Sequence, residues 1–256
     1  MRIWLATLIM TLAACKAPPE APEELDELSK YLYREWGNED PEVIAVGLAE
    51  LVNFLDGLDL EGPLNDRSFT IGPAGADTVQ YVDIPEGRDP DDTVGVSVAR
   101  ASEYAVTDHA RLQTEVDQLP TEPTASEYVR RFIEPTDPVC FVDHACDVMR
   151  TENDIRRNNL VISVSFVLYK EFRWSELPDD GGWGFLSRSW TDQVWYGNSG
   201  NTSIQQSYSL DVWLPAAGDT TWRYQLVWSE SDTAVNNPNL IAATLKNSSD
   251  NTIAAG

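Results

Sequence analysis

The feature of this sequence that most constrains its fold is a regular alternation of apolar and polar residues in three C-terminal segments. The segments are residues 160–174, 203–214 and 221–228, and their even-numbered positions are apolar except Lys170 and Gln206. Successive strand residues point to opposite faces of a sheet, so this alternation predicts strands with one buried face. Together with residues 186–196, and with turn-forming residues between them, the segments predict an antiparallel meander.

The alternation also assigns individual side chains to the two faces. The predicted core consists of the even-numbered residues of the last two segments: Tyr208, Leu210, Trp222, Tyr224, Leu226 and Trp228. Four polar residues at odd-numbered positions are expected to be exposed: Ser207, Ser209, Arg223 and Gln225. A polar face of this kind is typical of the solvated side of a sheet. If the sheet is instead buried on both faces, a closed barrel or a ligand cavity replaces this open arrangement.

Two helices are predicted before the sheet. The first spans residues 23–36, where apolar residues recur at helical spacing: Leu25, Leu28, Leu32 and Trp36. The second begins with Asp40 as its cap and Pro41 in its first turn, and it ends at Gly57 or Gly62. Because the turn between the helices is short, we expect an antiparallel helical hairpin.

The middle of the chain carries weaker patterns. Strands are predicted at 68–71, 79–84 and 93–99, helices at 102–119 (capped by Ser102) and 126–133, and a weak strand at 240–245. Residues 134–158 contain two cysteines and two prolines and receive no assignment. The expected fold class is α+β, with the N-terminal helical hairpin packed on a mainly antiparallel β-sheet. Since no linker-like segment interrupts them, residues 23–256 are expected to form one domain.

The N-terminus predicts export. Residues 3–11 form an apolar run that is too short to cross a bilayer as a permanent helix, and Arg2 precedes it. The run ends in Leu12-Ala13-Ala14-Cys15, which resembles the lipobox of bacterial lipoproteins. The resemblance implies that residues 1–14 are a signal peptide, that Cys15 is lipidated, and that residues 15–22 form a tether. Two or more acyl chains hold a protein stably on a membrane.

By resemblance to the sorting rule of enteric bacteria, Lys16 directly after the lipidated cysteine implies the outer membrane of the cell envelope. An ordinary cleaved signal peptide is the alternative. The formal net charge of −24 argues against nucleic acid as a partner, because so acidic a surface repels phosphate backbones. The expected partners are the membrane, through the lipid anchor, and an envelope protein or glycan.

The remaining two cysteines, Cys140 and Cys146, predict a disulfide in an exported protein. A loop this short contributes about 2–3 kcal/mol of stability in the chain-entropy model. Zinc bound by the cysteines with His144 is the alternative, but the spacing matches no common zinc knuckle. The acidic turn at 89–92 lacks the EF-hand pattern. We therefore expect no metal site and no cofactor.

Tryptophan is concentrated in the C-terminal part of the chain. Trp195 and Trp213 lie at odd positions among polar residues, which makes them candidate exposed contacts for a ligand. No catalytic motif is present, so no catalytic residue is assigned, and His109 is expected to be exposed on a helix. The function predicted from the sequence is a membrane-anchored envelope lipoprotein acting as a non-enzymatic binding or structural module. The alternative is a hydrolase acting on envelope polymers or glycans.

Overall fold

The structure is a computed structural model that describes residues 19–58, 67–122, 124–158, 163–198, 202–232 and 243. The described strands are β1 (Ser68–Ile71), β2 (Val94–Ser102), β3 (Ala125–Glu134), β4 (Val148–Asn158), β5 (Ser163–Glu176), β6 (Trp183–Trp190), β7 (Trp195–Tyr196), β8 (Ser203–Ala216) and β9 (Thr220–Ser231). The described α-helices are α1 (Leu25–Arg34), α2 (Pro41–Asp56), α3 (Val106–Thr114) and α4 (Val139–Val142). Short 3-10 turns are η1 (Glu35–Gly37), η3 (Pro90–Asp92) and η4 (Leu119–Thr121).

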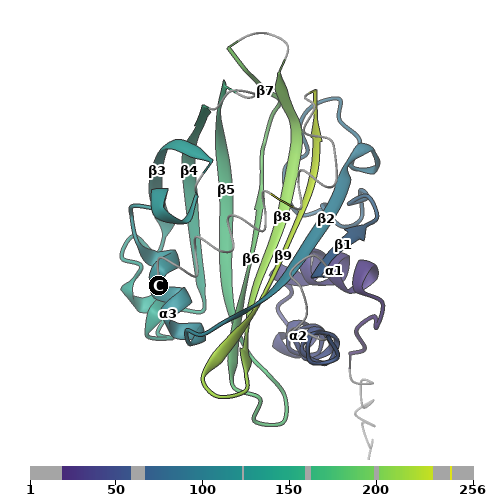
Figure 1. The fold of residues 1–256 in the computed structure, drawn as a ribbon, viewed down its shortest axis with the longest axis vertical. Helices are drawn as coiled ribbons and strands as arrows, with labels where there is room; N and C mark the ends of the chain where they lie inside the picture. Colours follow the sequence, from purple (N-terminus) through teal and green to yellow (C-terminus); the bar gives the residue numbers. More distant parts are fainter. Residues whose placement is uncertain are drawn as a thin grey trace, which may run out of the picture.

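All described strands join one antiparallel sheet, in the order β1-β2-β9-β8-β6-β5-β4-β3, with β7 paired to β8. The helices α1 and α2 lie at one face of this sheet, and α3 lies at the other (Figure 1). The expected α+β class and the C-terminal meander are therefore confirmed. No described helix is both long and apolar enough to cross a membrane.

The N-terminal helical hairpin forms where the sequence predicts it. The side chain of Asp40 accepts a hydrogen bond from the backbone N–H of Glu42, and Pro41 is the first residue of α2, so this helix begins with favourable capping. Leu28 and Leu32 of α1 and Leu48 of α2 are buried against the sheet. Tyr33 of α1 packs edge-on against Trp228 with ring centroids 5.6 Å apart.

The apolar face of β8 and β9 also agrees with the prediction. Tyr208, Leu210, Tyr224, Leu226 and Trp228 are buried in the core formed with α1 and α2, and Trp222 packs half-buried at its margin. The hairpin between the two strands turns at Gly218 and Asp219, which both adopt positive φ angles. This turn sets the register that pairs Leu210 with Leu226.

Several predictions for the middle of the chain are wrong. Residues 79–84 contain turns and no strand, residues 126–133 lie in β3 and not in a helix, and β4 occupies a stretch that received no assignment. Ser102 is the last residue of β2, and α3 begins four residues later at Val106. β3 and β4 carry charged residues on their outer face, so they lack the apolar alternation of the C-terminal strands. The weak strand predicted at 240–245 lies outside the described residues, apart from residue 243.

In β8 and β9 the sheet is buried on both faces, which corrects the expectation of one solvated face. Arg223 and Gln225, expected to be exposed, are only 4% and 6% exposed, and Ser207 and Ser209 are half-buried. The alternation of β5 does not continue the core face of β8 and β9. Phe172 of β5 pairs with Ser187 of β6, so their side chains lie on the same face of the sheet. Leu186, the residue before Ser187, packs on the opposite face with α1 and α2. The even-numbered residues of β5 therefore share the second face with Arg223.

The predicted disulfide is present. Cys140 and Cys146 are bonded, with a Cα–Cα distance of 5.4 Å. The bond closes a loop around α4, and Phe141 inside that loop is fully buried against Phe172, Trp174 and Phe185. The disulfide therefore constrains the local segment that covers one end of the second face.

Candidate functional site

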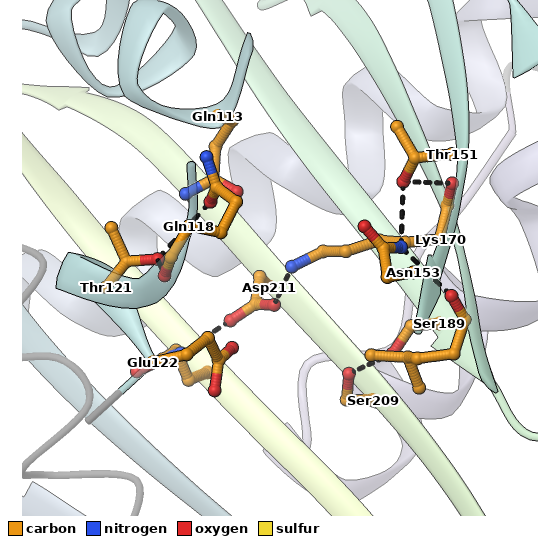
Figure 2. Close-up of polar contacts among 12 residues, drawn as sticks. Gln113, Gln118, Thr121, Glu122, Thr151, Asn153, Lys170, Ser189, Ser209 and Asp211 are labelled. Atoms are coloured by element: carbon orange, nitrogen blue, oxygen red, sulfur yellow. Dashed lines mark hydrogen bonds and ion pairs between the residues drawn. The ribbon is translucent and has the colours of Figure 1, made fainter. Parts of the chain in front are cut away.

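A small polar cavity lies between the second face of the sheet and the segment that runs from α3 to η4. Its volume is about 30 Å³, and the lining residues come from α3, η4 and strands β3, β5, β8 and β9: Gln113, Gln118, Thr121, Glu122, Tyr128, Arg130, Lys170, Asp211, Arg223 and Gln225. Figure 2 shows Gln113, Gln118, Thr121 and Glu122 on one side of Asp211 and Lys170 on the other. A space of this size holds one or two water molecules or a single polar group.

Asp211 is the central carboxylate of the cavity. Lys170 Nζ lies 3.1 Å from its Oδ2, Gln225 Nε2 donates to its Oδ1 at 2.7 Å, and Arg223 Nη2 lies 3.9 Å from Oδ1. Burial by itself raises the pKa of Asp211, but the charges of Lys170 and Arg223 and the hydrogen bonds outweigh it, so the pKa is lowered. The side chain is therefore ionised when the protein is folded at neutral pH.

Arg130 occupies the β3 side of the cavity. Its Nε donates to Asn153 Oδ1 at 2.9 Å, its Nη1 to the carbonyl oxygen of Gln113, and its Nη2 to the hydroxyl of Tyr128 at 3.2 Å. These acceptors are neutral, so their hydrogen bonds leave the positive charge of Arg130 uncancelled. Arg130 therefore holds α3 against the sheet and keeps a positive charge at the cavity.

Two lining residues carry polar atoms without hydrogen-bond partners in the described part of the chain. These atoms are Arg223 Nε, Arg223 Nη1 and Gln225 Oε1. Burial lowers the pKa of Arg223, and the charge of Arg100 on the neighbouring strand adds to that effect, while Asp211 and Glu122 oppose it. A buried guanidinium remains charged even so. Buried donors and acceptors normally have partners, so these atoms mark a place where a ligand can bind.

Aromatic residues flank the polar cavity. Trp213, predicted to be an exposed contact, is fully buried; its ring stacks on Phe185 at 4.3 Å and lies 5.5 Å from the guanidinium of Arg223. The prediction of exposure is therefore wrong, because the face on which Trp213 lies is covered by α3. Trp195 is half-buried in a separate cluster with Ile155, Val164 and Phe166, away from the cavity lining.

His109 is also buried, which corrects the expectation of an exposed helical histidine. It is 2% exposed, and its Nε2 lies 2.8 Å from the hydroxyl of Ser102, which is equally buried. Burial and, to a smaller extent, the charge of Arg223 lower the pKa of His109 to about 4, while the charge of Asp108 opposes the shift. A serine and histidine buried this completely hold α3 to the end of β2 and offer no surface to a polymer or glycan substrate.

The cysteine-rich loop has no metal-binding geometry in the described residues. Its two thiols are consumed by the disulfide, and His144 stacks on Trp174 with ring centroids 4.0 Å apart. In the part of the chain that the structure describes, no group of three or more histidine, cysteine or acidic residues is arranged to hold a metal ion.

The sequence analysis did not identify the residues that line the cavity. The only signal in the sequence was Lys170, because it is the one charged residue among the even-numbered positions of residues 160–174, which are otherwise apolar. Asp211 and Arg223 occupy odd positions that look solvated in the linear pattern. Their meeting depends on the register of β5, β6, β8 and β9, which places Lys170 and Asp211 on strands that flank β6.

No family model and no curated protein matches the chain. Among solved structures, a START superfamily protein from Mycobacterium smegmatis is 10% identical over 63% of this chain and 95% of that chain, with a TM-score of 0.39. A STAR-related lipid transfer protein from Xanthomonas axonopodis is 13% identical over 66% of this chain and 89% of that chain, with a TM-score of 0.41. The lipid transfer and protein localization domain of human StarD13 is 9% identical over 66% of this chain and 77% of that chain, with a TM-score of 0.40. Likeness at this level concerns the arrangement of helices and strands alone.

Proposed function

We propose that this protein is a lipid-anchored binding protein of the bacterial cell envelope, whose domain binds a small ligand in the polar cavity between α3 and the sheet. The observation that carries the proposal is the set of unpartnered polar atoms on Arg223 and Gln225, both more than nine-tenths buried at the cavity. Leaving such groups without partners destabilises a fold by about 1–3 kcal/mol each, and a ligand offsets that cost.

The arrangement of the cavity favours binding over hydrolysis. Asp211 is held by Lys170 and Gln225, so it is positioned to orient other groups and is not poised to accept a proton. The buried Ser102–His109 pair lacks access for a large substrate. A stiff, charged cavity on a sheet that is packed on both faces suits recognition of one polar group.

The proposed lipid anchor is based on the N-terminal sequence. The Leu12-Ala13-Ala14-Cys15 motif supports lipidation of Cys15, and Lys16 supports delivery to the outer membrane. The tether of residues 15–22 is long enough to let the domain stand off the membrane surface. A glycan or protein partner in the envelope remains part of the proposal.

The test is to extract the mature protein from its native membranes and to measure its mass under native and denaturing conditions. We expect a small molecule to accompany the folded wild-type protein and to be released on unfolding. Arg223→Met should lose this mass, while Arg156→Met should retain it, because Arg156 is an exposed residue that pairs with Glu127 at the surface. Equal retention by all three proteins, or no bound mass in any, would contradict binding in this cavity.

A further inference from the structure

The chemistry of the cavity specifies the ligand more narrowly. We propose that it takes a small oxyanion that also carries a hydroxyl group, so that Arg223 donates to the anionic oxygens and Gln225 accepts from the hydroxyl. This inference rests on the proposed function and adds the ligand class. A 2-hydroxycarboxylate and hydrogen phosphate are the two sources of this chemistry.

The charges of the lining favour an anion. Lys170, Arg130 and Arg223 bring three positive charges, against the carboxylates of Asp211 and Glu122. Glu122 is also shared with Arg157 outside the lining, at 3.8 Å. The cavity is thus cationic inside a protein whose formal net charge is −24. An anion that enters it gains interactions with buried positive charge that water screens only weakly.

The unpartnered atoms define where the ligand's oxygens belong. Arg223 Nε and Nη1 are donors without acceptors in the described residues, so they require acceptor oxygens. The orientation of Gln225 follows from chemistry, because its amide group faces the Asp211 carboxylate, which only accepts hydrogen bonds. The Gln225 amide nitrogen therefore faces Asp211, which leaves Oε1 as the free acceptor of this lining residue. An O–H group on the ligand satisfies that oxygen.

The size of the cavity restricts the ligand to a compact polar head. A volume of about 30 Å³ limits the part of the ligand inside the cavity to a few polar atoms and excludes a fatty or aromatic body. Glu122 lies at the edge with a side chain that is 27% exposed, so the cavity has a route to solvent on that side. A larger ligand can place its anionic head inside and its remaining atoms outside.

Four probes separate the components of this recognition. Binding of glycolate, acetate, glycolamide and inorganic phosphate to the mature wild-type protein is measured by calorimetry at constant ionic strength. Glycolate carries both groups, acetate lacks the hydroxyl, and glycolamide lacks the charge. We expect glycolate or phosphate to bind at least tenfold more tightly than acetate and at least a hundredfold more tightly than glycolamide. Whether glycolate or phosphate binds more tightly identifies the source of the oxyanion.

Variants test the role of each side chain. Arg223→Gln should weaken glycolate binding at least thirtyfold, whereas the matched control Arg156→Gln should change it less than twofold, because Arg156 is at the surface. Gln225→Met should bring the affinities of glycolate and acetate together, since it removes the acceptor that distinguishes them. If Arg223→Gln does not fold, the Gln225→Met comparison and the wild-type probe series still test whether the cavity binds an oxyanion that carries a hydroxyl group.

Each of the following results would contradict the inference. Glycolamide binding as tightly as glycolate, or a neutral small molecule released from the native protein, would show that the cavity does not select an anion while the binding function stands. Failure of all four probes together with no ligand bound to the native protein would remove both the inference and the proposed function. An unchanged preference for glycolate over acetate in Gln225→Met would refute the assignment of the hydroxyl to Gln225.

Discussion

His109 provides a direct test of how tightly α3 packs on the sheet. The ring is 2% exposed, lies 2.8 Å from the Ser102 hydroxyl, and packs edge-on against Tyr104 with ring centroids 6.4 Å apart. Burial and the charge of Arg223 lower its pKa from 6.5 to about 4. The folded protein therefore keeps this histidine neutral in a pH range where the unfolded chain protonates it.

The direction and size of the effect follow from proton linkage. Above the unfolded pKa of 6.5 neither state binds the proton, and His109 has no effect on the pH dependence of stability. As the pH falls, the unfolded state takes up a proton first, so the free energy of unfolding decreases until the folded state also protonates near pH 4. The loss is about 2 kcal/mol by pH 5 and about 3 kcal/mol at the limit.

The assay is urea unfolding followed by tryptophan fluorescence at pH 8, 6 and 5. We expect wild-type protein to lose about 2 kcal/mol more than His109→Gln between pH 8 and pH 5, because glutamine keeps a hydrogen bond to Ser102 but does not titrate. The control is His144→Gln: burial also lowers the pKa of His144, but this residue is only half-buried, so its substitution should change the pH dependence less. If His109→Gln loses as much stability as wild type over this range, the histidine is not held neutral by burial.

Three further outcomes are expected. Labelling with a fatty-acid probe should mark the wild-type protein and not Cys15→Ala; equal labelling of both would exclude lipidation at that residue. Cys140→Ser with Cys146→Ser should lower the free energy of unfolding by about 2 kcal/mol, the chain-entropy value for so short a loop, and intact mass with and without reductant should detect the bond. Leu226→Ala should cost about 2–5 kcal/mol because Leu226 is buried in the α1–α2 core. Ser209→Ala, which removes only the hydrogen bond to Ser189, should cost about 1 kcal/mol, and similar losses for both would contradict the face assignment.

Local patterns in the sequence were sufficient for the elements that bury a continuous apolar stripe. The 3.6-residue period placed α1 and α2, and the two-residue period placed β5, β8 and β9. The core face of β8 and β9 followed from the same period, since a one-residue shift would expose all of its apolar side chains. The disulfide followed from two cysteines that are six positions apart in the sequence.

Strands β3 and β4 show why the local pattern was insufficient elsewhere. Their outer faces carry ion pairs such as Arg150 with Glu171, and their inner faces carry polar residues such as Arg130 and Asn153, which are hydrogen-bonded to each other. Neither face has a continuous apolar period, and this explains why the prediction of a helix at residues 126–133 is wrong. Pairing with β5, a tertiary interaction, holds these residues in the sheet.

By itself, the sequence determined the helical hairpin and the C-terminal meander, because each of these depends on a short-range pattern of apolar residues. Only the tertiary structure decided that the polar face of the sheet is covered. The segment from α3 to η4 packs across that face and buries Arg223, Gln225 and His109. Lys170, Asp211 and Arg223 come from three different strands, and they line one cavity because of strand order and register, which alternation in any one segment does not encode.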